Sequence, residues 1–260
     1  MIDTVIFDIG GTLEDIWVSE ESKLAAATEV LNILKKFNIA TPISDVSEAF
    51  QELHNGWQRY SKYKFETDRE LKPEEIWGNY ILNDKFGLDL NKVKNFAEEL
   101  SYIWEKTYFH RELRPGVHEM LEGLKSLGMK LGVMSNTSSL FGVFSVLKQH
   151  KLRNYFQDIT LSSITGYRKP DPHIFWISLN QLQSLPSTSA YVGDTLSRDV
   201  VGPQKVGFAM TFHINSHLTE QSNSNNHFDG IRPTYSIKNI GEVYTILKNL
   251  KENNAQIYLN

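Results

Sequence analysis

The stretch Val5-Ile6-Phe7-Asp8-Ile9-Gly10-Gly11-Thr12-Leu13 decides how this chain folds. Its opening apolar residues are typical of a buried β-strand, and the glycine pair predicts a tight turn directly after that strand. Asp8 stands where the strand ends. We therefore expect residues 2–8 to form a buried strand that presents the Asp8 carboxylate at its carboxyl end.

Beyond residue 111, apolar runs of strand length alternate with stretches of helical spacing. This order predicts an α/β fold with a doubly wound parallel sheet, a Rossmann-like core covered by helices on both faces. In such sheets ligands bind outside the carboxyl ends of the strands. The sequence predicts further strands at 130–135, 158–161, 190–193 and 208–212, a mobile Asn- and Ser-rich surface loop at 217–230, and a closing helix at 240–250.

Residues 17–111 differ from the rest of the chain, because they show helical spacing and no convincing strand. This segment holds 15 of the 30 aromatic residues, which indicates a small core of its own, an apolar cleft wall, or both. We expect a helical cap domain at 17–111 and an α/β core from 1–16 and 112–260. Within the segment, helical spacing covers about 44–62, 73–86 and 91–109.

The composition of the 260 residues excludes several classes of protein. The net charge of −4 argues against a nucleic-acid-binding protein, which should carry a basic face. The absence of cysteine excludes disulfides, thiolate zinc sites and cysteine nucleophiles. No apolar run approaches the roughly 18 residues of a membrane span, and no secretory signal is visible. The expectation is a cytoplasmic protein without nucleic-acid or membrane partners.

Three carboxylates are expected at one edge of the predicted sheet. Asp8 ends the first strand, Asp194 ends the strand at 190–193, and Asp199 lies one turn further on. Because carboxylates that converge repel one another, a cation is needed between them. With no cysteine and no histidine at these strand ends, hard oxygen ligands predict Mg²⁺.

Other polar residues are expected at the same edge. Ser135 and Asn136 end the strand at 130–135, and Lys169 precedes Pro170 in a loop. A lysine beside Mg²⁺ predicts an anionic substrate, and we favour a small phosphorylated molecule. Each of these residues alone has an ordinary structural explanation, as a turn residue, a helix cap or a solvent-exposed loop lysine. The set, in this order, is what indicates a site.

Four segments together resemble the haloacid dehalogenase-like (HAD) superfamily, with a helical cap inserted after the first motif. The likeness is to the branch of phosphoglycolate phosphatase and β-phosphoglucomutase, and it covers residues 5–199. The segments are Phe7-Asp8-Ile9-Gly10-Gly11-Thr12-Leu13, Met134-Ser135-Asn136, Tyr167-Arg168-Lys169-Pro170-Asp171-Pro172-His173-Ile174-Phe175 and Val192-Gly193-Asp194-Thr195 with Arg198-Asp199.

The resemblance implies a role for each matching residue. Asp8 is similar to the nucleophile that takes the phosphoryl group as an aspartyl-phosphate, and Lys169 to the cation that holds nucleophile and phosphate together. The implied metal ligands are Asp8, the backbone carbonyl of Gly10, Asp194 and, directly or through water, Asp199, and the implied phosphate-binding residues are Ser135 and Asn136.

Gly10 departs from the pattern of the family's phosphatases, which carry a second Asp two residues after the nucleophile. That Asp protonates the leaving group and then activates water, and such help is typically worth about 10²–10⁴ in rate. Three explanations stay open: a substrate with a good leaving group, such as an acyl or aryl phosphate; a low-turnover binding or regulatory protein; or a substitute side chain. The candidates for a substitute are Glu14, Asp15, His54 and His110.

Dehalogenation is a further alternative, in which Asp8 attacks carbon instead of phosphorus. Dehalogenases of the superfamily need no metal, and their last motif lacks the Gly-Asp step that Gly193 and Asp194 retain here. The sequence therefore favours a Mg²⁺-dependent hydrolase of small phosphorylated metabolites.

Overall fold

A computed structural model describes residues 1–82, 85–220, 223 and 232–257, so part of the expected loop at 217–230 lies outside the described residues. The predicted parallel sheet is confirmed: its strand order is β5-β4-β1-β6-β7-β8, and every neighbouring pair is parallel. The strands are β1 (Thr4–Phe7), β4 (Lys130–Ser135), β5 (Asp158–Leu161), β6 (Ser189–Gly193), β7 (Met210–Ile214) and β8 (Tyr235–Ile237).

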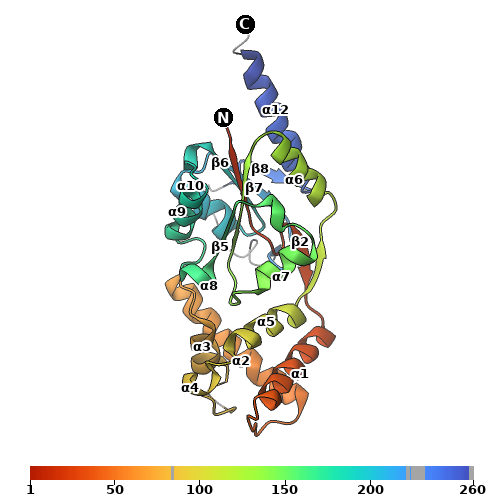
Figure 1. Cartoon of the computed structure of the whole chain (residues 1–260), viewed down its shortest axis with the longest axis vertical. Helices are drawn as coiled ribbons and strands as arrows, with labels where there is room; N and C mark the ends of the chain where they lie inside the picture. The colour runs from red at the N-terminus through yellow and green to blue at the C-terminus, as the bar shows by residue number, and fades with distance from the viewer. Residues whose placement is uncertain (83–84, 221–222, 224–231, 258–260) are drawn as a thin grey trace.

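Helices cover both faces of this sheet (Figure 1). Along β1 the side chains of Val5 and Phe7 enter one apolar cluster, whereas Ile6 enters the cluster on the opposite face. Burial on both faces explains why the strands are continuous apolar runs. The helices are α6 (Val117–Ser126), α7 (Gly142–Gln149) and α12 (Glu242–Ile257) on the first face, and α9 (Pro172–Gln181) and α10 (Gly202–Val206) on the second, with α8 (Ser162–Thr165) after β5.

Three short strands escaped the sequence analysis. The expectation of no strand in the helical segment is wrong at its two ends, because β2 (Glu14–Trp17) and β3 (His110–Leu113) pair as an antiparallel ribbon. These strands are polar, and Glu14 is fully buried as a charged partner of Arg111, so no apolar alternation marks them. The edge strand β8 has three residues, which is too short for a periodic signal.

The helices between β2 and β3 form a layer beyond the carboxyl ends of the sheet strands (Figure 1). A separate apolar cluster holds this layer together, and the rings of Trp57, Trp104 and Tyr108 stack within it. The expected stretch at 73–86 is helical as far as Ile81, first as an α-helix and then as a π-helix. The stretch at 91–109 is interrupted between Val93 and Ala97, because apolar spacing marks buried positions and not continuity. The helices are α1 (Glu20–Lys36), α2 (Val46–Thr67), α3 (Pro73–Ile76), the π-helical η1 (Trp77–Ile81), α4 (Leu90–Val93) and α5 (Ala97–Tyr108).

Short helical turns complete the described chain, and one of them carries site residues. The π-helical η4 (Leu196–Val201) follows β6 and leads into α10. Among the helices that the structure describes, none combines the length and the apolar character that a membrane span requires. The other two turns are η2 (Arg153–Tyr155) and η3 (Pro186–Thr188).

Gly56 tests the packing of the helical layer. It lies where α2 crosses η1, and a Cβ atom there would lie 2.6 Å from Ile81 Cα and 2.7 Å from the Tyr80 carbonyl oxygen. Because backbone atoms give way poorly, we expect Gly56→Ala to lower the free energy of unfolding by about 1–3 kcal/mol, despite the higher helix propensity of alanine. Urea unfolding measures this, with Gln51→Ala on the exposed face of α2 as the control. Equal or greater stability of Gly56→Ala would contradict the close approach.

Candidate active site

Asp8 lies at the carboxyl end of the central strand β1 and is 6 % exposed. Its backbone N–H donates to the carbonyl of Val192 at 2.9 Å, which continues the pairing of β1 with β6 past the last strand residue. The structure brings together the three carboxylates expected at this edge. Oxygens of Asp8, Asp194 and Asp199 all lie within 4.8 Å of one another.

Lys169 lies between two of these carboxylates. Its ammonium nitrogen is 3.0 Å from Asp8 Oδ1 and 2.7 Å from Asp199 Oδ1, and it also donates to the Tyr191 hydroxyl at 2.9 Å. The second oxygen of Asp199 accepts from the Thr195 N–H at 2.9 Å. Asp199 therefore holds Lys169 against Asp8, and both oxygens of Asp199 are already engaged.

Burial and mutual repulsion act on the clustered carboxyl groups. Burial, followed by the charges of Asp8 and Asp199, raises the pKa of Asp194 to about 7. Burial also raises the pKa of Asp8, although Lys169 opposes the change. A divalent cation among these groups would remove the cost of keeping them charged, and an all-oxygen donor set suits Mg²⁺.

Two glycines allow these groups to approach the backbone. At Gly11, where φ is +81°, a Cβ would lie 2.1 Å from Asp194 Oδ2; at Gly193 it would lie 2.3 Å from Asp199 Cβ. Gly10 is different, because it has no left-handed φ and a Cβ there would meet only Ile16 Cδ1 at 3.1 Å. Of the two glycines in the expected tight turn, only Gly11 therefore has a positive φ.

Three residues that the sequence analysis missed hold Asp194 in place. Its backbone carbonyl accepts from His213 Nε2 at 2.9 Å, from the Thr219 hydroxyl at 3.0 Å and from the Asn223 side-chain amide at 2.8 Å. Burial lowers the pKa of His213, so this histidine acts as a neutral donor. Only His213 offered a signal in the sequence, because it lies on a predicted strand, which the structure pairs with β6. Thr219 and Asn223 lie in the segment that the sequence predicts as a polar loop.

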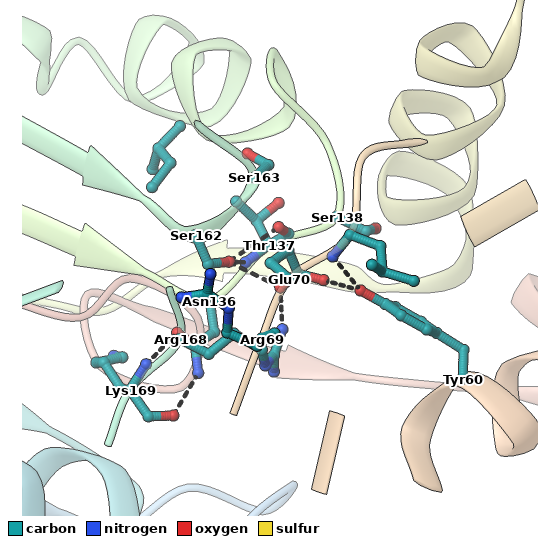
Figure 2. A network of polar contacts seen from close by, with 12 residues as sticks. Tyr60, Arg69, Glu70, Asn136, Thr137, Ser138, Ser162, Ser163, Arg168 and Lys169 are labelled. Carbon is teal, nitrogen blue, oxygen red and sulfur yellow. Dashed lines mark hydrogen bonds and ion pairs between the residues drawn. The ribbon is translucent and has the colours of Figure 1, made fainter. Parts of the chain in front are cut away.

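Ser135 and Asn136 also lie at this edge, and both line the cavity that contains Asp8. The side-chain amide of Asn136 is occupied: it donates to the Lys169 carbonyl at 3.0 Å and accepts from the Lys169 N–H at 2.9 Å. Any contact of Asn136 with a phosphate therefore falls to its backbone N–H, while its side chain positions Lys169 (Figure 2).

The cavity of about 210 Å³ around Asp8 adjoins a larger one of about 490 Å³ beneath the helical layer. The larger cavity has an aromatic wall on one side and polar groups from the core on the other. Both cavities share Glu105, Phe109, Asn136, Thr137 and Arg198.

Two of the expected substitutes for an acid at residue 10 are engaged elsewhere. The buried carboxylate of Glu14 pairs with Arg111 and His150, each at 2.8 Å. Asp15 pairs with Arg114 at 2.7 Å. Neither carboxylate lines the two cavities described above.

The two histidine candidates differ from each other in their position. His110 bonds to the Ser19 hydroxyl at 3.0 Å and stacks on Trp17, outside both cavities. His54 lines the larger cavity, where its Nε2 accepts from the Gln58 amide at 2.9 Å.

Carboxylates of α5 bind the loop that follows β4. Glu105 accepts from the Thr137 hydroxyl at 2.8 Å and from the Ser138 N–H at 2.8 Å. Glu98 accepts from the Ser139 hydroxyl at 2.7 Å. This loop begins at the phosphate-site candidates, so the helical layer is anchored directly beside the site.

A second anchor between the layers centres on Glu70, which is buried between α2 and the core (Figure 2). Its carboxylate accepts from the Tyr60 hydroxyl, from the Arg168 guanidinium and, at 2.8 Å, from the Ser162 hydroxyl. Arg168 directly precedes Lys169, so the contact links the helical layer to the segment that carries the site lysine.

Comparison with known proteins bears on this geometry. Residues 5–212 match the family described as "Haloacid dehalogenase-like hydrolase". Over 249 residues, 95 % of this chain and 100 % of the relative, the chain is 29 % identical to the glyceraldehyde 3-phosphate phosphatase of Methanothermobacter thermautotrophicus.

One further relative matches this chain over part of its length, and one solved structure resembles it in fold. The chain is 35 % identical to the haloacid dehalogenase-like hydrolase domain-containing protein 3 of Bos taurus, over 46 % of each protein. The match therefore spans about half of that relative. The fold resembles a 2-haloacid dehalogenase of Pseudomonas syringae pv. Tomato DC3000, with a TM-score of 0.66, 20 % identity and coverage of 96 % of this chain and 100 % of the other. That likeness shows the fold alone.

The contrast between the two glycines after Asp8 is testable. Gly11→Ala combines a left-handed φ, which costs about 1–2 kcal/mol for alanine, with a clash on Asp194. We expect it to lower stability in urea and to displace Asp194. Gly10→Ala should remain near wild type, because only the end of the flexible Ile16 side chain must shift. Equal effects of the two substitutions would show that the turn is built differently.

Proposed function

The chain belongs to the haloacid dehalogenase-like hydrolase family, and we propose that it is a cytoplasmic, Mg²⁺-dependent phosphatase of small phosphorylated metabolites. The observation that carries this proposal is the cluster of Asp8, Asp194 and Asp199 around the Lys169 ammonium group. A buried cluster of this charge suits a divalent cation and a phosphate. The likeness to a glyceraldehyde 3-phosphate phosphatase over 95 % of the chain supports the same substrate class.

The residues divide the work as follows. Asp8, the Gly10 carbonyl and Asp194 would hold Mg²⁺ directly, and Asp199, whose oxygens are engaged, would hold it through water. Bound Mg²⁺ would supply charge neutralisation between two anions that must approach each other. Lys169, the Ser135 hydroxyl and the Asn136 N–H would hold the phosphoryl oxygens. Residues 17–111 would act as the cap that closes over the substrate.

The reaction has two steps. An Asp8 oxygen attacks phosphorus, and the bond from phosphorus to the leaving oxygen breaks as the aspartyl-phosphate forms. Water then attacks the phosphorus, which releases inorganic phosphate and restores the Asp8 carboxylate. Gly10 has no side chain to protonate the leaving oxygen in the first step or to activate water in the second.

Asp8→Asn tests the nucleophile. It preserves the size of the side chain and removes its charge, so turnover of 4-nitrophenyl phosphate should fall by more than about 10³-fold. Single-turnover trapping should give a phosphorylated wild type and no phosphorylated variant. Asp45→Asn is the matched control, because Asp45 caps α2 and asparagine caps equally well. A folded Asp8→Asn protein with substantial activity would exclude Asp8 as nucleophile.

Removal of the metal tests the cofactor. With excess chelator, activity on 4-nitrophenyl phosphate should fall below about one hundredth, and added Mg²⁺ should restore it. Full activity in chelator would refute the metal assignment. Absence of phosphate release both with and without Mg²⁺ would favour the dehalogenase alternative. Release of halide from a 2-haloacid would then be the reaction to measure.

A further inference from the structure

The larger cavity identifies where the leaving group of a substrate lies. A phosphate held at Asp8 occupies the smaller cavity, and the shared lining makes the larger cavity its continuation toward the helical layer. The alcohol part of a phosphate ester therefore extends beneath α2 and α5. A group that protonates the leaving oxygen must face this space, since residue 10 offers no side chain.

Most ionisable groups around the larger cavity are poor proton donors. The carboxylate oxygens of Glu70 and Glu105 are already occupied, because each group accepts several hydrogen bonds from O–H and N–H donors. Burial raises the pKa of Tyr108. His54 Nε2 is engaged with the Gln58 side-chain amide at 2.9 Å, so this nitrogen is not directed at the cavity. The two arginines of the lining keep their protons in all conditions.

Lys64 is the remaining candidate. It extends from α2 into the larger cavity and also lines a neighbouring cavity together with Lys169 and Arg198. Its ammonium group lies over the ring of Tyr60, 4.8 Å from the centroid, and 5.9 Å from that of Trp57. Within the described residues, no hydrogen bond or ion pair occupies its protons.

The surroundings of Lys64 favour release of a proton. Glu70 and Glu105 face it from one side, and Arg168 and Arg198 from the core. Burial, followed by the charge of Arg168, lowers the pKa of Lys64 to about 8. An acid works best when its pKa lies near the operating pH, so this lysine matches the task better than an exposed one.

We propose that Lys64 protonates the leaving oxygen, the step for which residue 10 has no side chain. As the bond from Asp8 to phosphorus forms, the electron pair of the breaking bond takes a proton from the ammonium group, which becomes an amine. The amine regains a proton from solvent once the alcohol has left, and the ammonium group is restored. This inference rests on the proposed phosphatase function.

Leaving groups of different basicity test the assignment. An alkoxide needs a proton, whereas a nitrophenolate does not, so Lys64→Met should lower kcat on glycerol phosphate by about 10²-fold and on 4-nitrophenyl phosphate by less than about threefold. Lys62→Met is the control, because Lys62 lies on the same helix and is exposed. Equal losses on both substrates, or no loss, would overturn the proposal.

Lys64→Arg separates proton transfer from charge. Arginine keeps the positive charge and does not release a proton, so it should leave kcat on glycerol phosphate near that of Lys64→Met. An acid acts in its protonated form, so the wild-type rate on this substrate should fall as pH rises through about 8. Wild-type activity in Lys64→Arg would show that charge alone matters.

A second substitution links Lys64 to residue 10. In the Lys64→Met background, Gly10→Asp should raise kcat on glycerol phosphate about tenfold or more and leave 4-nitrophenyl phosphate nearly unchanged. No selective gain in a folded double variant would contradict the shared role. A wild type that cleaves only the aryl ester overturns the Lys64 assignment and leaves the phosphatase intact, whereas one that cleaves neither ester with Mg²⁺ refutes both.

Discussion

The ammonium group of Lys169, held between Asp8 and Asp199, is the interaction on which the site depends. Charges of one sign gather here because parallel strands end at one edge, and burial makes their repulsion costly. The ammonium group of Lys169 and the guanidinium group of Arg198 offset part of that repulsion, and the raised pKa of Asp194 shows what is left. The remaining imbalance is what makes a divalent cation and a phosphate suitable occupants.

The backbone around this ion pair is shaped to admit it. Asp194 lies against Gly11 and Asp199 lies against Gly193, so closely that a Cβ atom on either glycine would clash with them. Asn136 uses its side chain to fix the backbone of Lys169, which leaves its backbone N–H for the expected contact with a phosphate. The charged groups of the site are thus positioned by neutral hydrogen-bond donors, and glycines leave the space that these groups occupy.

The helical layer is anchored to the core by carboxylates. Glu70 binds beside Lys169, and Glu98 and Glu105 bind the loop after β4. Each anchor lies next to a residue of the site, so displacement of the layer would alter the site directly. The cavity between the layers presents aromatic rings from one side and cations from the other, which suits an ester whose phosphate faces the core.

The succession of strands along the chain and the polar residues at their ends followed from the sequence alone, because a strand buried on both faces is a continuous apolar run. The order of the strands across the sheet came from the structure, whereas the carboxyl ends of parallel strands lie at one edge of the sheet. The three carboxylates could be placed together for that reason. The β2–β3 ribbon could not, since its buried Glu14 depends on partners about 100 and 140 residues away. Nor could Lys64, Glu70 or His213 be assigned, because their roles come from neighbours on other elements. Local pattern determines which segments are strands and helices; the surroundings that set a side chain's charge, and hence its chemistry, exist only once the layers have packed.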